Sequence, residues 1–235
     1  MMKNNIPISL FAYNFPHKKT QDFIYRLLSE GYEINVIYAA DPVKLNIPQS
    51  NIKSKINHIG LLHPQEIAKN LGIRYLVTSH DSEVLKEDAR INPSLAVICG
   101  ARILKAEVID LFPSGIINFH PGIIPFARGL DALFWSIYNN QPLGVTAHLI
   151  DKRIDAGKIL SVEEIRIYSN DTILDLSERL YELQLVMLTK SIEKAILNEG
   201  YFLENYGEYN RKMESHLENK IIDLLPNYIL NRSNV

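Results

Sequence analysis

Short apolar runs separated by polar segments with helical spacing recur along the first half of the chain. Four runs have the length and apolar content of buried strands: 6–13, 34–39, 75–78 and 95–99. Four other segments place their apolar residues three and four positions apart, as helices do: 21–30, 64–71, 83–91 and 105–111. Strands and helices that alternate in this way are typical of a parallel sheet covered by helices, so the pattern predicts an α/β fold with a Rossmann-like opening.

Local signals set several boundaries in this half. Thr20 is a good N-cap for the first helix, and Gly31 ends that helix. Residues 41–54 contain two prolines and predict a loop, while residues 56–59 suggest a short strand. The neighbouring His80 and Asp81 invite a catalytic interpretation, but a loop before a helix with Asp81 as its cap is the simpler explanation.

The second half continues with strand and helix patterns and then changes character. An apolar run stops at Pro121-Gly122, and strands at 144–150 and 158–167 follow a helix at 130–138. A long helix from a cap at 170–172 to about 198 ends at Gly200. These elements complete a mixed, mainly parallel sheet over residues 1–200.

Residues 201–235 are richer in asparagine, tyrosine and charge, with one amphipathic piece at 214–225. A segment this short cannot form an independent domain, so we expect a C-terminal extension. Its many aromatic and aliphatic side chains need a surface to cover them, either the main domain or a second copy. We therefore predict a homodimer with this extension at or near the interface.

Composition narrows the function classes. The chain has 235 residues, 46% of them hydrophobic, and a formal net charge of −2. That charge gives no general attraction to nucleic acid or to anionic membranes. We find no signal-peptide pattern and no run near the ~18 apolar residues of a membrane span. The single Cys99 excludes an internal disulfide and favours a cytoplasmic location, and core packing is its expected role.

Three polar residues form the best candidate for a reaction centre. Asn118 and His120 share one face of a strand at its carboxyl end, where open α/β sheets bind ligands. Asp155 follows 35 residues later in a polar loop between two strands. An imidazole titrates near neutral pH, a carboxylate fixes its tautomer, and an amide can hold an oxyanion. The combination suits acyl transfer to a nitrogen nucleophile, and no Cys/His cluster suggests a metal.

The residues around this centre resemble a known family. Asn-x-His-Pro-Gly-x-x-Pro-x-x-Arg-Gly, then Gly-Val-Thr-Ala-His, then Asp-Ala-Gly occur in the order typical of folate-dependent formyltransferases. The resemblance implies a formyltransferase-type sheet, a 10-formyltetrahydrofolate donor without a metal, and catalytic roles for Asn118, His120 and Asp155. Gly122 departs from several relatives, which have serine after His-Pro; this leaves the three residues intact and could reshape the acceptor side.

The resemblance also implies where the two substrates bind. The small residues after the strand at 95–99 correspond to the loop that packs against the folate pterin, and with two residues near Asp155 they form the expected folate site: Gly100, Ala101, Arg102, Ile103, Asp151 and Ile154. The first loop and helix start, and the turn after His120, offer cations for an acceptor phosphate: His17, Lys18, Lys19 and Arg128. Solvated surface charges are the alternative for these four. His148 is expected behind the reaction centre.

The acceptor remains open between several members of the family. Methionyl-tRNA formyltransferases carry an additional C-terminal β-barrel, for which residues 201–235 are too few. Glycinamide ribonucleotide formyltransferases have a glycine-containing first loop that Phe15-Pro16-His17 does not resemble. We therefore favour a sugar N-formyltransferase that acts on a dTDP- or UDP-linked amino sugar for surface polysaccharide. The alternatives are purine-pathway transfer, another formyl transfer or hydrolysis of formylfolate, and an inactive folate- or nucleotide-binding relative.

Overall fold

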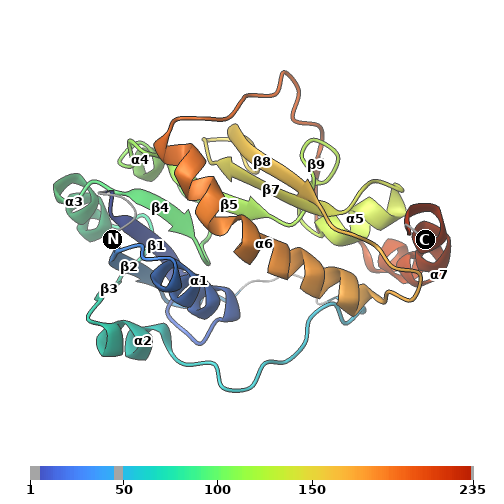
Figure 1. The fold of residues 1–235 in the computed structure, drawn as a ribbon, viewed down its shortest axis with the longest axis horizontal. Coiled ribbons are helices and arrows are strands. Elements are labelled where there is room, and N and C mark those ends of the chain that lie inside the picture. Colours follow the sequence, from blue (N-terminus) through green and yellow to red (C-terminus); the bar gives the residue numbers. More distant parts are fainter. Residues whose placement is uncertain (1–5, 45–49, 234–235) are drawn as a thin grey trace.

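One mixed sheet organises the molecule, seen in a computed structural model that describes residues 6–44 and 50–233. Its strand order is β3-β2-β1-β4-β5-β7-β8. The strands are β1 (Ile8–Tyr13), β2 (Ile34–Ala40), β3 (Arg74–Val77), β4 (Leu95–Ile98), β5 (Ile116–His120), β7 (Gly144–Leu149) and β8 (Lys158–Glu164). Strands β1 to β5 run parallel, whereas β7 and β8 are antiparallel to their neighbours. The expected mainly parallel α/β sheet is confirmed (Figure 1).

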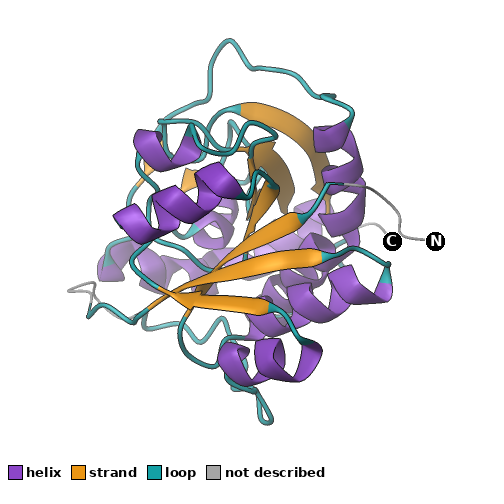
Figure 2. Cartoon of the chain, turned by 90° about the vertical axis from the view of Figure 1, so that its left-hand side faces the viewer, coloured by secondary structure: helices purple, strands orange, loops and turns teal. Residues whose placement is uncertain are grey.

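Helices cover both faces of this sheet. They are α1 (Lys18–Ser29), α2 (Pro64–Leu71), α3 (Glu83–Ile91), α4 (Ala106–Ile109), α5 (Ala132–Tyr138), α6 (Ile173–Ile196) and α7 (Ser215–Arg232). Helices α1, α2 and α6 lie on one face and α3 and α4 on the other (Figures 1 and 2). Alternation along β1 decides the layering, because Leu10 joins the α1/α6 core while Phe11 joins the α3/α4 core. Full burial of such a side chain stabilises the fold by roughly 1.5–3 kcal/mol.

Most predicted helix and strand boundaries are confirmed to within a few residues. Two helix ends illustrate the local signals that set them. Helix α6 starts with a capping box in which Thr172 and Asp175 satisfy each other's backbone N–H groups. Helix α2 ends at Gly72, whose φ of 67° lies in the left-handed region that glycine tolerates. The prediction for Thr20 was wrong: α1 starts earlier, with His17 at its N-cap, and Thr20 is buried in the first turn.

Two other local predictions were also wrong. Residues 56–59 form no strand, because their side chains stand in solvent with no neighbouring strand to pair with; Ile59 is fully exposed. Ser82, not Asp81, caps α3, its hydroxyl accepting from the N–H of Leu85, while Asp81 pairs with Lys105. The predicted loop at 41–54 is irregular where described, and its residues 45–49 lie outside the described part.

The C-terminal segment packs against the main body of the same chain. Tyr201 forms an isolated antiparallel bridge with Ile159 of β8. Strand β9 (Tyr209–Asn210) pairs with β6 (Arg128–Gly129), a small strand pair that the sequence did not suggest. Helix α7 lies against α5, buries Ile221 and Tyr228 in the main core, and continues well past the expected 214–225 (Figure 1). Within residues 6–44 and 50–233, no helix has the length and apolar character needed to cross a bilayer.

Candidate active site

Strand β5 carries two of the candidate residues to the carboxyl edge of the sheet. Asn118 and His120 are two positions apart, so both point to the same side, while Phe119 between them enters the core behind α1 and α6. On one side β5 pairs with β4, whose carboxyl end lies at this edge, and on the other with antiparallel β7, which brings His148 opposite Asn118. The sheet therefore supplies three polar side chains at one point.

The loop between β7 and β8 brings in Asp155. Its backbone is tightly constrained: Asp155 has a φ of 44°, and Gly157 has a φ of 102°. A Cβ on Gly157 would lie 2.2 Å from the carbonyl oxygen of Leu149, so only glycine fits where the loop returns to β7. This geometry holds the Asp155 carboxylate against the end of β5.

The structure places the three predicted residues together. Asp155 Oδ1 lies 3.6 Å from His120 Nδ1 and 3.5 Å from Asn118 Nδ2. His120 is only 4% exposed, and its Nε2 lies 2.6 Å from the carbonyl oxygen of Ala127. Since a carbonyl can only accept, Nε2 carries a proton. Both ring nitrogens thus face acceptors, an arrangement that suits an imidazole cycling through its cation.

His148 lies directly behind this group. It is fully buried, its Nδ1 donates to the carbonyl of Ala156 at 2.8 Å, and its Nε2 accepts from Asn118 Nδ2 at 3.3 Å. Burial lowers the pKa of His148 to about 4, with Asp155 opposing that shift. A neutral His148 therefore fixes the orientation of the Asn118 amide. We call Asn118, His120, His148 and Asp155 the buried corner.

Two cavities meet at the buried corner. The first, of about 610 Å³, contains His120 and Asp155 and extends to α1, α5, α6 and the loop around Lys55. The second, of about 430 Å³, contains Asn118 and Asp155 and extends to residues 101–104 and 150–154. Asp155 lines both cavities, so a ligand in one can meet a ligand in the other beside its carboxylate. We call the first the lysine-side cavity and the second the loop-side cavity.

The lysine-side cavity contains three of the four predicted acceptor residues, His17, Lys18 and Lys19. Lys18 is already engaged, since its Nζ lies 2.6 Å from Asp22 and 3.9 Å from the centre of the Tyr181 ring. Lys19 forms no ion pair with a described residue, and its Nζ lies 5.1 Å from the Phe23 ring centre. Burial lowers the pKa of Lys19 to about 8 and that of His17 to about 4. At neutral pH the positive charge here therefore comes from lysines and not from His17.

Sequence reasoning missed other groups of this cavity. Lys55 and His58 come from the irregular loop after β2, and Glu178 and Tyr181 come from α6. The loop has no periodicity that would signal its position, and α6 lies far along the chain. Only packing of α6 across α1 and β5 brings these residues to the edge of the sheet. We call Lys18, Lys19 and Lys55, together with the neighbouring His17 and His58, the cationic rim; its charge comes from the lysines.

The fourth predicted acceptor residue, Arg128, does not line this cavity. Its Nε donates to the carbonyl of Ile154 at 2.7 Å and its Nη1 to the carbonyl of Gly207 at 3.2 Å. The side chain therefore braces the Asp155 loop against the C-terminal segment. The structure gives no support to the expected phosphate clamp at Arg128, because its guanidinium is committed to backbone carbonyls.

The loop-side cavity contains all but one of the residues predicted for the folate site: Ala101, Arg102, Ile103, Asp151 and Ile154. Gly100 lies behind this wall, where a Cβ would come within 2.6 Å of the Tyr13 ring. Tyr13, Arg153 and Tyr209 also line this cavity and were not predicted. Tyr13 could have been found from its place at the end of β1, next to β4. Tyr209 could not, because its position depends on the β6–β9 pairing.

Two further observations concern Cys99 and metal-binding groups. Cys99 is buried, and burial raises the pKa of its thiol to about 12, which fits the predicted packing role and an inert thiol. Within the described ranges, no three His, Cys, Asp or Glu side chains lie close enough to hold a metal ion.

Comparison with known proteins gives a consistent picture. Residues 41–192, more than half of the chain, match the sequence model of the family described as formyl transferase. The chain is 29% identical over 180 residues to a methionyl-tRNA formyltransferase of Caldanaerobacter subterraneus subsp. tengcongensis, covering 74% of this chain and 55% of that protein. A methionyl-tRNA formyltransferase of Thermodesulfovibrio yellowstonii is 31% identical over 116 residues, 48% of this chain and 38% of that protein. The chain thus spans about half or less of these two curated relatives.

Solved structures share the fold. A sugar N-formyltransferase from a Shewanella species superposes with a TM-score of 0.63 at 21% identity, covering 94% of this chain and 87% of that chain. A phosphoribosylglycinamide formyltransferase from Anaplasma phagocytophilum gives a TM-score of 0.63 at 16% identity, covering 90% and 97%. At such low identity these similarities establish the architecture and leave the acceptor open.

Proposed function

Because the chain belongs to the formyl transferase family, we propose that it transfers a formyl group from 10-formyltetrahydrofolate to the primary amine of a dTDP- or UDP-linked amino sugar. One observation carries the proposal: Asp155 lines two cavities at once, with His120 in one and Asn118 in the other. A group transfer needs a donor and an acceptor that meet at the reacting groups, and this arrangement provides that meeting point.

The buried corner supplies the chemistry. The neutral amine attacks the formyl carbon, and the carbonyl electrons move to its oxygen. Asn118 Nδ2 and protonated His120 Nδ1 make only long contacts with Asp155, at 3.5 and 3.6 Å, so both can donate to that oxyanion when it forms. Each such hydrogen bond is worth roughly 3–4 kcal/mol in the transition state. His120, with Asp155 beside its Nδ1, then takes part in moving a proton from the amine to the departing folate nitrogen. His148 keeps the Asn118 amide in place during these steps.

We assign the formyl donor to the loop-side cavity. Its walls combine apolar side chains such as Ile103 and Ile150 with the irregular segment after β4, which suits a flat ring system that hydrogen-bonds at its edge. The small Ala101 lets such a ring approach the backbone closely. The family uses a formylated folate in general, and the position of this cavity beside Asn118 supports the same donor here.

The acceptor assignment rests on the lysine-side cavity. Lys19 and Lys55 line the same cavity as Asp155, so an acceptor with its amine at the buried corner can place its phosphates at the cationic rim. Side-chain cations that reach outward suit a diphosphate, which favours the sugar nucleotide.

A ribonucleotide acceptor is the second candidate, since the same lysines can hold a single phosphate. Calorimetric titration with dTDP, UDP and a glycinamide ribonucleotide analogue separates the two. Micromolar binding of dTDP or UDP, followed by formyl transfer to the matching amino sugar nucleotide, is the expected result. Binding of the ribonucleotide analogue alone would assign the enzyme to purine synthesis with the same reaction centre.

We also propose that residues 1–200 form the catalytic domain and that residues 201–235 contribute to a homodimer. Most of the extension packs on its own chain, yet Phe202, Ile222 and Leu230 remain 66%, 61% and 76% exposed. Exposed aromatic and aliphatic side chains of this size are characteristic of interfaces. Light scattering at micromolar concentration is expected to give twice the monomer mass, and a monomer mass contradicts the proposal.

A further inference from the structure

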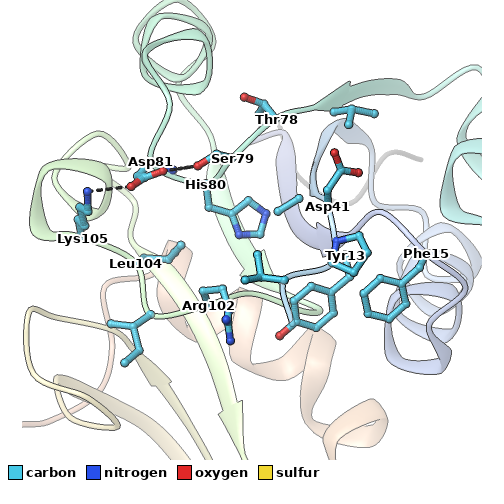
Figure 3. A pocket seen from close by; sticks show the side chains of 15 residues that line it. Tyr13, Phe15, Asp41, Thr78, Ser79, His80, Asp81, Arg102, Leu104 and Lys105 are labelled. Carbon is cyan, nitrogen blue, oxygen red and sulfur yellow. Dashed lines mark hydrogen bonds and ion pairs between the residues drawn. The ribbon is translucent and has the colours of Figure 1, made fainter. Parts of the chain in front are cut away.

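A third cavity, separate from the buried corner, lies at the carboxyl ends of β1 to β4. It has a volume of about 630 Å³ and contains none of Asn118, His120 or Asp155. Four residues line both this cavity and the loop-side cavity and form the wall between them: Tyr13, Arg102, Ile103 and Leu104. Figure 3 shows the side chains that enclose it, with His80 among Asp41, Tyr13 and Arg102. The proposed formyl transfer uses neither Asp41 nor His80.

The position of this cavity in the sheet matches that of nucleotide sites in related folds. Strands β2 and β3 lie on one side of β1, and β4 lies on the other. The order in which the chain adds strands to the sheet therefore reverses beside β1. In sheets of this order, nucleotides bind outside the carboxyl ends of the strands, and an acidic residue after the second strand holds the ribose hydroxyls. Asp41 is the residue immediately after β2 and lines the cavity.

The Asp41 carboxylate is oriented for such a contact. Its Oδ1 accepts a 2.7 Å hydrogen bond from Asn14 Nδ2, and Asn14 in turn accepts 2.8 Å from the Tyr75 hydroxyl. The second oxygen accepts no hydrogen bond from the described part of the chain. A carboxylate with one oxygen fixed and the other open is a good acceptor for a pair of neighbouring hydroxyls.

His80 provides an independent signal. It is 6% exposed, and its Nε2 lies 3.1 Å from the carbonyl oxygen of Tyr38, so Nε2 carries the proton. Burial lowers the pKa of His80, which keeps the ring neutral and leaves Nδ1 as an acceptor. Nδ1 is buried and has no hydrogen-bond partner among the described residues, and the ring is directed into the cavity (Figure 3). A ligand with an N–H donor would satisfy an atom that is costly to leave unpaired.

The remaining walls fit the other parts of a nucleotide. Val43 and Val77 are 65% and 44% exposed at the cavity, and together with the stacked Tyr13 and Phe15 they provide apolar surface for a flat base. Arg102 forms no ion pair with a described residue, whereas Lys105 is paired with Asp81 at 2.7 Å. Arg102 is therefore the free cation for a phosphate.

From these contacts we propose that the cavity is a second ligand site that binds a ribonucleoside monophosphate with an amino-bearing base. Asp41 accepts the ribose hydroxyls, His80 Nδ1 accepts from the amino group, and Arg102 pairs with the phosphate. The first βα turn lacks the glycines with which a dinucleotide site approaches a pyrophosphate, so the site suits a mononucleotide. The proposal does not rest on the formyl-transfer function.

The test is calorimetric titration of the full chain with AMP. We expect 1:1 binding in the micromolar range that weakens about tenfold or more with 2′-deoxy-AMP and with IMP, which carries an oxygen in place of the amino group. Asp41→Asn should weaken AMP binding by about tenfold or more, because the amide cannot replace the open carboxylate oxygen. Asp223→Asn, the same change on an exposed turn of α7, is the control and should leave AMP binding unchanged.

Two results would overturn the proposal. The first is the absence of AMP binding at millimolar concentration by folded protein. The second is binding that persists in Asp41→Asn and disappears in Lys19→Met, because the nucleotide would then occupy the lysine-side cavity. Equal affinity for AMP and IMP overturns the assignment of His80 to the base. Formyl transfer by Asp41→Asn at the wild-type rate is expected whatever the AMP result, which keeps this test separate from the proposed function.

Discussion

The buried corner and the cationic rim both contribute to the lysine-side cavity and are built in opposite ways. In the corner, His120 and His148 are 4% and 0% exposed, and each ring is fixed by a backbone carbonyl. At the rim, Lys19 has no ion-pair partner in the described chain, and Lys55 extends from a loop that forms neither helix nor strand. The corner is fixed by the sheet, whereas the rim consists of long side chains on α1 and a loop.

This difference indicates which part of the proposed formyl transfer each region controls. A reaction centre needs fixed geometry, because misplacement of a donor by about 1 Å can cost on the order of 100-fold in rate. Recognition of an acceptor needs complementary charge, which a few side chains on loops can change. Proteins named for a tRNA, a ribonucleotide and a sugar all resemble this chain. The shared fold therefore supports the chemistry, and we expect the rim to select the acceptor.

The largest expected effect is in the corner. His120→Ala and Asp155→Ala should each lower kcat by roughly 1,000-fold or more with the fold intact, since general acid–base and oxyanion contributions are lost together. Steady-state formyl transfer measures the rate, and circular dichroism checks the fold. His216→Ala, an exposed histidine on α7, is the matched control. Near-wild-type turnover of either variant at saturating substrates would remove that residue from the reaction.

The second prediction tests the position of the Asp155 carboxylate while leaving that residue itself unchanged. Gly157→Ala should lower kcat about 10- to 100-fold and lower Tm, because the new Cβ would meet the Leu149 carbonyl at 2.2 Å and displace the loop. Gly72→Ala is the control, since Gly72 has a φ of 67° but nothing within 4 Å of its Cβ. It carries only the left-handed strain of ~1–2 kcal/mol. Equal activity of the two variants would show that the loop tolerates the clash.

The third effect belongs to the rim. Lys19→Met keeps the apolar contact with Phe23 and removes the charge, so the acceptor KM should rise about tenfold, equivalent to ~1.4 kcal/mol, with kcat little changed. Lys18→Met should have a smaller effect, because its ammonium is already paired with Asp22. Initial rates at varied acceptor concentration give both constants. A fall in kcat at constant KM would move Lys19 from recognition to catalysis.

The smallest effect is a pH dependence of acceptor binding. The pKa of Lys19 is about 8 because burial disfavours its ammonium, so the charge is present at pH 7 and is lost as pH rises toward 9. Binding of dTDP or UDP should therefore weaken by up to about tenfold over that range, and Lys19→Met should abolish the dependence.

The effect of Lys19 titration on folding stability has the opposite sign to its effect on ligand binding, so the two can be told apart. The pKa of Lys19 in the fold lies below its usual 10.5, so the unfolded chain binds more protons between about 8 and 10.5. This group therefore contributes a stability that increases with pH in that window. Titration of Lys19 thus cannot weaken binding by unfolding the protein. Unchanged dTDP affinity from pH 7 to 9 would contradict the role of Lys19.

The sequence by itself determined most of the fold and the core of the site. Apolar runs and helical spacing gave the strands and helices, because burial enforces a period of two or of three to four. The placement of Asn118 and His120 on one face followed from the same period, and Cys99 was correctly assigned to the core. The strand predicted at 56–59 failed because its two isoleucines are exposed and no neighbouring strand pairs with the segment.

Only the tertiary structure decided which residues share a cavity. Tyr209, Lys55 and Tyr181 come from separate elements, and no local pattern says that they approach the end of β5. The same reason explains Arg128, whose donors go to the carbonyls of Ile154 and Gly207. A side chain's charge can be read from the sequence, but its partner is fixed by the packing of segments far apart in the chain.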